Sequence, residues 1–124
     1  MKLQSKSNWH KRELALCGTN CEEINKWVNY FQLEVNQRLA YVDASHAEGR
    51  LEAANGITTH ENHFVLQEET GLDQTVLQEF DGALVNGNHH TASNQIIFVN
   101  LEKEKSLVKR SPELTRVLAV VLPE

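Results

Sequence analysis

The chain has 124 residues, 40% of them hydrophobic and 23% charged, and a formal net charge of −5. This size fits one domain with a single hydrophobic core. The acidic balance argues against sequence-independent nucleic-acid binding, which needs lysine and arginine to neutralise phosphates. No apolar run reaches the roughly 18 residues that span a bilayer, and the N-terminus has no apolar stretch typical of a secretory signal. These features predict a cytoplasmic protein that binds neither nucleic acid nor a membrane.

A short apolar strand, a glycine-containing turn and an amphipathic helix are predicted over residues 12–35. The strand covers 12–17, the turn covers 18–20, and the helix covers 21–35. Asn20 stands three residues before Glu23, a spacing typical of a helix N-cap. The apolar side chains of the helix recur at helical spacing and should face the core. They are Ile24, Trp27, Val28, Phe31 and Val35.

This turn stands where a nucleotide-binding P-loop has its phosphate-binding residues. A P-loop ends in Gly-Lys-Ser/Thr, with the lysine on the terminal phosphates and the hydroxyl on magnesium. Here Cys21 and Glu22 occupy those two positions, and Glu23 adds a second carboxylate at the helix end that attracts anions. Each close carboxylate–phosphate pair costs on the order of several kcal/mol at an effective dielectric of about 20, before screening. The sequence therefore predicts the scaffold of a nucleotide site without its chemistry. An ordinary capped helix after an ordinary strand is the alternative.

The rest of the chain alternates apolar runs with polar or helical segments. The predicted elements are strands over 38–43, 82–85, 95–100 and 116–122, a hairpin over 57–60 and 63–67, and a short helix over 72–80. The charged run 102–105 is expected to be a solvated loop or turn. Short apolar strands separated by helices are typical of a mainly parallel sheet with helices on both faces. We therefore expect a three-layer α/β domain over 12–124, preceded by a tail over 1–11.

In such sheets the ligand crevice lies beyond the carboxyl ends of the strands, where the strand order reverses. We expect the loops at 18–20, 43–49 and 86–90 to meet there. The candidates for ligand contact in these loops are Gly18, Thr19, Asn20, Asp43, His46, Asn86, Gly87 and His89. No residue is assigned a catalytic or metal-binding role, and no cofactor is predicted.

The chain has two cysteines, Cys17 and Cys21, and a disulfide framework is not expected. A packing or neutral loop position is favoured for both over a redox or metal-binding pair. A metal site built from Cys17, Asp43, His46 and His89 is an alternative, although the spacing matches no common ligand pattern. The histidines of the 86–90 loop are more simply surface residues beside the crevice.

Taken together, these segments resemble the molybdopterin-guanine dinucleotide biosynthesis protein B (MobB) family. These small P-loop NTPase-like proteins accompany the nucleotidyltransferase that builds the guanine-dinucleotide form of molybdenum cofactor. The likeness runs from about Glu13 to Leu122 and rests on an ordered set of segments rather than on one motif. The segments are 13–19, 41–46, 63–70, 81–90, 96–100 and 116–120.

The chain departs from this family at the residues that handle nucleotide. The P-loop lysine and hydroxyl are replaced by Cys21 and Glu22, and Asn86 stands where the family has an acid that helps to hold magnesium. Family members bind GTP and hydrolyse it weakly. With three losses on one ligand, the resemblance implies a non-catalytic accessory domain in molybdenum cofactor biosynthesis, whose partner is the nucleotidyltransferase or a molybdopterin species.

Several alternatives stay open at this point. One is a small-ligand-binding module of the same fold, and another is a protein that binds and hydrolyses GTP weakly. The family's final strand and helix have no match in this sequence, so a larger fused protein with this domain at its N-terminus is a further expectation. A homodimer is also compatible with these features.

Overall fold

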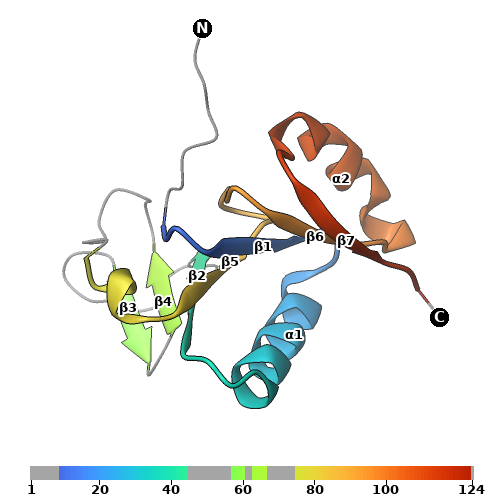
Figure 1. Ribbon diagram of the computed structural model, residues 1–124. Coiled ribbons are helices and arrows are strands. Elements are labelled where there is room, and N and C mark those ends of the chain that lie inside the picture. Colours follow the sequence, from blue (N-terminus) through green and yellow to red (C-terminus); the bar gives the residue numbers. More distant parts are fainter. Residues whose placement is uncertain (1–8, 45–56, 61–62, 67–74, 124) are drawn as a thin grey trace, which may run out of the picture.

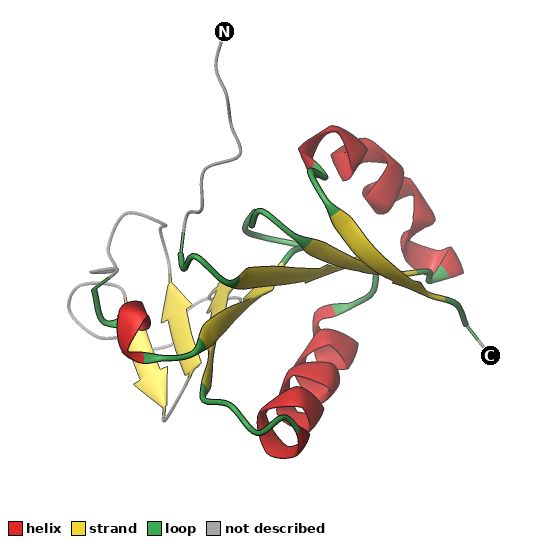
Figure 2. Cartoon of the chain, in the orientation of Figure 1, coloured by secondary structure: helices red, strands yellow, loops and turns green. Residues whose placement is uncertain are grey.

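The computed structural model describes residues 9–44, 57–60, 63–66 and 75–123. They form an α/β domain with one seven-stranded sheet and helices on both of its faces (Figures 1 and 2). The predicted α/β class with a mainly parallel sheet is confirmed by this arrangement. Among the described residues, no helix combines the length and apolar character needed to cross a membrane.

The elements follow one another as short strands separated by helices, with η marking a 3-10 helix. They are β1 (Glu13–Cys17), α1 (Cys21–Glu34), β2 (Leu39–Ala44), β3 (Ile57–His60), β4 (His63–Leu66), η2 (Leu77–Glu79), β5 (Gly82–Asn86), β6 (Gln95–Phe98), η3 (Leu101–Lys103), α2 (Glu104–Arg110), η4 (Ser111–Glu113) and β7 (Val117–Val121). Each strand lies within two residues of its predicted limits. The predicted hairpin is present as the antiparallel pair β3–β4, and its turn at 61–62 lies outside the described residues.

The strands are ordered β3-β4-β2-β5-β1-β6-β7, and all of them except β3 run parallel. The chain leaves β1 through α1 for β2 on one side, and leaves β6 through α2 for β7 on the other. Helices α1 and α2 lie on opposite faces of the sheet (Figure 1). The strand order therefore reverses beside β1, and parallel sheets provide a ligand crevice at such a point.

Each face of the sheet has its own apolar cluster. The α1 face buries Leu16, Ile24, Val28, Tyr41, Leu84 and Phe98. The opposite face buries Trp9, Ala15, Cys17, Ala40, Val42, Phe64, Leu77, Phe80, Ala83, Val85, Ala92 and Ile97, with Leu107 and Leu114 packed against them. Burial on both faces explains why β1, β2, β5 and β6 read as continuous apolar runs rather than as alternating patterns. The edge strand β7 is also a continuous apolar run, but four of its five residues are exposed.

The predicted apolar stripe of α1 is correct except at its last residue. Ile24 and Val28 are buried, and Trp27 and Phe31 are half-buried. Val35 was expected in the core but is 38% exposed. The helix ends at Glu34, and the extended backbone of Val35 (φ −87°, ψ 133°) takes its side chain off the helical stripe.

Two further expectations differ from the structure. The charged run 102–105 was expected to be a loop, but it spans η3 and the start of α2. The Asn100 side chain accepts a hydrogen bond from the Glu102 amide at 2.9 Å and so caps this segment. A helix was predicted over 72–80, and its first residues, 72–74, lie outside the described residues. The described remainder contains only the short 3-10 helix Leu77–Glu79.

The end of the predicted N-terminal tail packs into the domain. Trp9 is 3% exposed and His10 is buried beside it. The Trp9 indole donates to the Thr91 carbonyl at 2.8 Å. The Glu13 carboxylate accepts from the backbone amides of Trp9 and His10 at 2.7 and 3.0 Å. The ordered packing therefore begins before residue 12, and Glu13 ties the incoming chain to β1.

Candidate functional site

The turn between β1 and α1 requires glycine at its first position. Gly18 has φ +99°, and a Cβ atom there would lie 2.3 Å from the Phe98 carbonyl oxygen. The next residues cap the helix: Asn20 Oδ1 accepts from the Glu23 amide at 2.8 Å, as the sequence predicts. The backbone therefore makes a tight strand–turn–helix connection of the kind that holds phosphates in other proteins.

The Thr19 hydroxyl in this turn makes two hydrogen bonds. Thr19 is buried, and its Oγ1 donates to Glu23 Oε1 at 2.7 Å. The same oxygen accepts from the Asn100 side-chain amide at 2.9 Å. Asn100 follows β6, so this hydrogen bond joins the two loops that flank the reversal in strand order. Thr19 thus serves the internal structure of the turn.

A side chain from the loop after β5 closes over the turn. Asn88 Nδ2 donates to the Thr19 carbonyl oxygen at 2.6 Å, and Asn88 Oδ1 lies 3.5 Å from the Gly18 amide nitrogen, a long hydrogen bond. The Asn88 backbone amide in turn donates to Asn86 Oδ1 at 2.9 Å. Asn88 was not among the residues expected from the sequence. Its only sequence signal is its place in the polar loop that begins at Gly87.

Asn86 links three neighbouring elements at the end of β5. It is fully buried, and its Nδ2 donates to Asp43 Oδ1 at 2.8 Å and to Cys21 Sγ at 3.3 Å. Asp43 lies near the end of β2, and Cys21 opens α1. An amide is suited to this position because it can donate to a carboxylate and still accept from Asn88, whereas an ionised acid could only accept.

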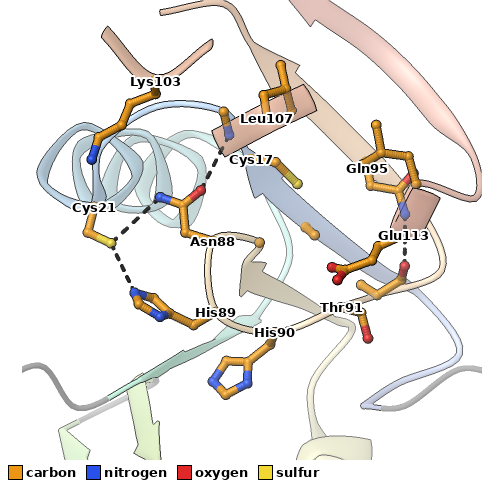
Figure 3. Close-up of a pocket in the computed structure, with 15 residues that line it drawn as sticks. Cys17, Cys21, Asn88, His89, His90, Thr91, Gln95, Lys103, Leu107 and Glu113 are labelled. Atoms are coloured by element: carbon orange, nitrogen blue, oxygen red, sulfur yellow. Dashed lines mark hydrogen bonds between the residues drawn. The ribbon is translucent and has the colours of Figure 1, made fainter. Parts of the chain in front are cut away.

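The Cys21 thiol lies beside the side chains of Asn88 and His89 (Figure 3). Its Sγ is 3.5 Å from His89 Nε2 and 3.8 Å from Asn88 Nδ2, in addition to the contact with Asn86. Its side chain is half-buried, whereas Cys17 is buried. The sequence favoured a packing or neutral loop position for Cys21, and in the structure Cys21 is one of the residues that line the cavity.

A buried tyrosine faces the same group of residues. The Tyr41 side chain is 1% exposed, and among the residues that the structure describes its hydroxyl has no well-formed hydrogen-bond partner. Burial raises the pKa of Tyr41 far above its usual value, and the negative charges of Asp43 and of Cys21 raise it further. The hydroxyl therefore stays protonated and is available as a donor beside this cluster.

A cavity of about 380 Å³ opens between the rim loops and the α2 segment. Its walls are formed by Ala15, Cys17, Gly18, Cys21, Gly87, Asn88, His89, His90, Thr91, Ala92, Gln95, Lys103, Leu107, Glu113 and Leu114. Lys103 and Glu113 are the charged side chains in this wall, and Figure 3 shows them on opposite sides of the opening. This volume lies in the range of small-ligand pockets.

The structure brings most of the predicted candidates to one rim. Gly18, Gly87 and His89 line the cavity. Thr19, Asn20, Asp43 and Asn86 lie behind it in the hydrogen-bonded network of the loops. His46 lies outside the described residues. Over the described parts of the chain, no group of three or more His, Cys, Asp or Glu side chains is arranged to hold a metal ion.

Sequence reasoning did not propose Cys21, Asn88 or Lys103 as ligand contacts, although all three line the cavity. Lys103 belongs to the charged run that was expected to be a solvated loop, and only the packing of the 103–114 segment over the sheet brings it to the cavity. Comparison of the chain with protein-family models, with curated proteins and with solved structures finds no match.

Proposed function

We propose that this chain is a non-catalytic accessory domain of molybdenum cofactor biosynthesis, with the architecture of a P-loop NTPase but without nucleotide turnover. The proposal rests on the resemblance of the ordered sequence segments to the MobB family. The strand order is compatible with it, because β1 and its glycine turn lie next to β5, the strand that ends at Asn86.

The observation that carries the proposal is that side chains of the protein itself hydrogen-bond to the backbone of the turn. The Asn88 side chain bonds to the Thr19 carbonyl and to the Gly18 amide, and the Asn20 side chain accepts from the Glu23 amide. A P-loop offers amides of this kind to phosphate oxygens. A polyphosphate would therefore have to displace hydrogen bonds that the protein already makes.

The charges around the turn support the same conclusion. The position of the P-loop lysine is held by Cys21, which brings no positive charge. Glu22 is exposed at the start of α1, and Glu23 is held beside Thr19. These two carboxylates would repel a triphosphate at the helix end where anions usually bind. Lys103 reaches the cavity from a different element and supplies one cation to the wall.

Within this function, the cavity favours carriage of a molybdopterin species or docking of the nucleotidyltransferase at the rim. A ligand in this cavity would contact amide and imidazole groups of Asn88, His89 and His90. These groups suit a nitrogen-rich heteroaromatic ring, because they can donate and accept hydrogen bonds.

Calorimetry with purified molybdopterin and with the purified nucleotidyltransferase tests this proposal. The variant Leu107→Trp adds bulk to the cavity wall, and Leu33→Trp makes the same change at a site on α1 that is 82% exposed. We expect binding of at least one of the two partners, weakened by Leu107→Trp and unchanged by Leu33→Trp. Absence of binding to both partners would overturn the proposal.

The second candidate is a small-ligand module of the same fold, which the cavity also favours. A thermal-shift screen of uncharged and cationic metabolites separates the two functions, because a ligand that binds only the native state raises the melting temperature. A metabolite that raises the melting temperature, together with no binding of molybdopterin or the transferase, would support the second candidate.

A further inference from the structure

The chemistry around Cys21 goes beyond a binding role. Cys21 is the first residue of the 14-residue helix α1, and its half-buried thiol lines the cavity. Its sulfur is 3.5 Å from His89 Nε2. In the tautomer with an unprotonated Nε2, the thiol donates to the imidazole. A thiol that can pass its proton to an adjacent imidazole is arranged for attack by its sulfur.

Two amides point at the same sulfur. The Nδ2 atoms of Asn86 and Asn88 lie 3.3 and 3.8 Å from Sγ. Both amides are held in place by other bonds, Asn86 to Asp43 and Asn88 to the Thr19 carbonyl. Donors that are fixed in advance stabilise negative charge where it develops during a reaction. The neighbouring carboxylate of Glu22 acts in the opposite direction, but it is exposed to solvent and therefore screened.

A second, independent observation distinguishes this cluster from a packed surface thiol. The side chain of Tyr41 is 1% exposed, and its hydroxyl has no well-formed hydrogen bond within the described part of the chain, although buried hydroxyls nearly always have one. Asp43, Cys21 and Asn86 all act on this hydroxyl, so it lies beside the residues that surround the thiol.

We propose that Cys21 and His89 form a thiol–imidazole pair that exchanges with low-molecular-weight disulfides, and that the cavity receives the attached group. Cys21 gives its proton to His89 Nε2, and its sulfur attacks one sulfur of the disulfide. A bond forms between Sγ and that sulfur while the original S–S bond breaks. The leaving thiolate then takes the proton from the imidazolium. The products are a mixed disulfide on Cys21 and one free thiol, and an added thiol reverses the reaction.

This exchange makes Cys21 a modification site that controls access to the crevice. A group attached to Sγ would occupy the cavity wall shared with His89 and Asn88, so modified protein would lose any ligand that uses this space. The exchange itself does not depend on which ligand or partner the domain binds. Its failure in an experiment is therefore distinguishable from a failure of the proposed function.

The test is the reaction of the full chain with oxidised glutathione at neutral pH, followed by intact-protein and peptide mass spectrometry. We expect one glutathione adduct, located on Cys21, formed at least tenfold faster than on free cysteine under the same conditions. Cys21→Ser should abolish the adduct, and His89→Gln should slow its formation by about tenfold or more. Because His89 is exposed, His89→Gln should unfold at the wild-type temperature.

Cys17 is the internal control, because it belongs to the same chain but is buried. Repetition with cystamine, a cationic disulfide, separates the thiol chemistry from recruitment of a negative probe by Lys103. The slowing by His89→Gln should appear with both probes. Reaction of Cys17 before Cys21, a Cys21 rate no higher than that of free cysteine, or an unchanged rate in His89→Gln would each overturn the proposal.

Discussion

Asn86 Nδ2 lies 2.8 Å from Asp43 Oδ1, so a buried side-chain hydrogen bond joins the ends of the neighbouring parallel strands β5 and β2. The same amide nitrogen reaches Cys21 at the start of α1. The relationship explains why an amide suits this position, because it donates to the Asp43 carboxylate. An acid at this position would need a cation to neutralise it against Asp43.

Replacing Asn86 with aspartate tests this relationship. Asn86→Asp removes the donor and places two carboxylates in contact within the protein, so the free energy of unfolding at neutral pH should fall by about 2 kcal/mol or more. Like carboxylates repel only when both are ionised, so the loss should shrink as the pH falls toward about 4. Urea unfolding measures both effects. Asn29→Asp, on the exposed side of α1, should change stability by less than about 0.5 kcal/mol, and an equal loss in both variants would contradict the account.

The buried hydroxyl of Tyr41 should contribute little to stability. Tyr41→Phe keeps the ring and removes a polar group that has no well-formed hydrogen bond to the described residues, so the free energy of unfolding should stay the same or rise by up to about 1 kcal/mol. Tyr30→Phe, at a side chain that is 54% exposed, is the matched control and should be neutral. A clear loss of stability in Tyr41→Phe would mean that the hydroxyl does have a partner.

The raised pKa of Tyr41 also predicts an alkaline effect. In the unfolded chain Tyr41 loses its proton near its usual pKa of about 10, whereas in the folded chain it keeps the proton. Above about pH 10 the folded state therefore binds more protons, and the free energy of unfolding should decrease as the pH rises. Tyr41→Phe should show a shallower decrease than the wild type in urea unfolding between about pH 9 and 11. Identical slopes would contradict this assignment.

The turn after β1 should tolerate no side chain at its glycine. In Gly18→Ala the new Cβ meets the Phe98 carbonyl oxygen at 2.3 Å, and φ +99° is unfavourable for alanine. We expect a loss of about 3 kcal/mol, from steric overlap and backbone strain together. Gly82→Ala is the comparison, because its nearest contact is 3.0 Å from the Arg12 carbonyl oxygen. It should cost clearly less in the same denaturation experiment.

Trp9 should behave as a core residue although it lies close to the N-terminus. Trp9→Ala removes a side chain that is 3% exposed and should cost about 3–5 kcal/mol. Trp9→Phe keeps most of the apolar contact but loses the hydrogen bond to the Thr91 carbonyl. The lost hydrogen bond should lower the free energy of unfolding by about 1 kcal/mol, in addition to the loss of packing from the smaller ring. Chemical denaturation of the two variants gives both values. A neutral Trp9→Ala would show that the chain before β1 does not pack on the sheet.

Local patterns predicted the elements whose apolar residues form a long run or a regular stripe. The α1 stripe through Ile24 and Val28 shows helical periodicity, and the strand from Gly82 is a continuous apolar run, so the burial of both follows directly from the local sequence. The helix α2 was missed because most of its described side chains are exposed and Leu107 is its main contact with the core. Its signal lies in tertiary packing rather than in the sequence around it.

The residues of the site also differ in how far the local sequence predicts their positions. Gly18 and Gly87 were predicted to lie in loops at the carboxyl ends of the strands, where parallel sheets have their crevice, and both line the cavity. The sequence could not show that Asn88 folds back over the Thr19 carbonyl, since that hydrogen bond joins residues far apart in the chain. The pairing of Cys21 with His89 depends on the same long-range approach of two loops.

Titration calorimetry with GTP and magnesium tests most directly whether the turn can hold a polyphosphate. The wild-type chain should show no saturable binding at micromolar concentrations, because its own side chains occupy the turn and Glu22 and Glu23 repel phosphate. The double variant Cys21→Lys/Glu22→Thr introduces the lysine and the hydroxyl that P-loops carry after their turn, and it should gain measurable binding. A micromolar Kd for GTP in the wild-type chain would contradict the account.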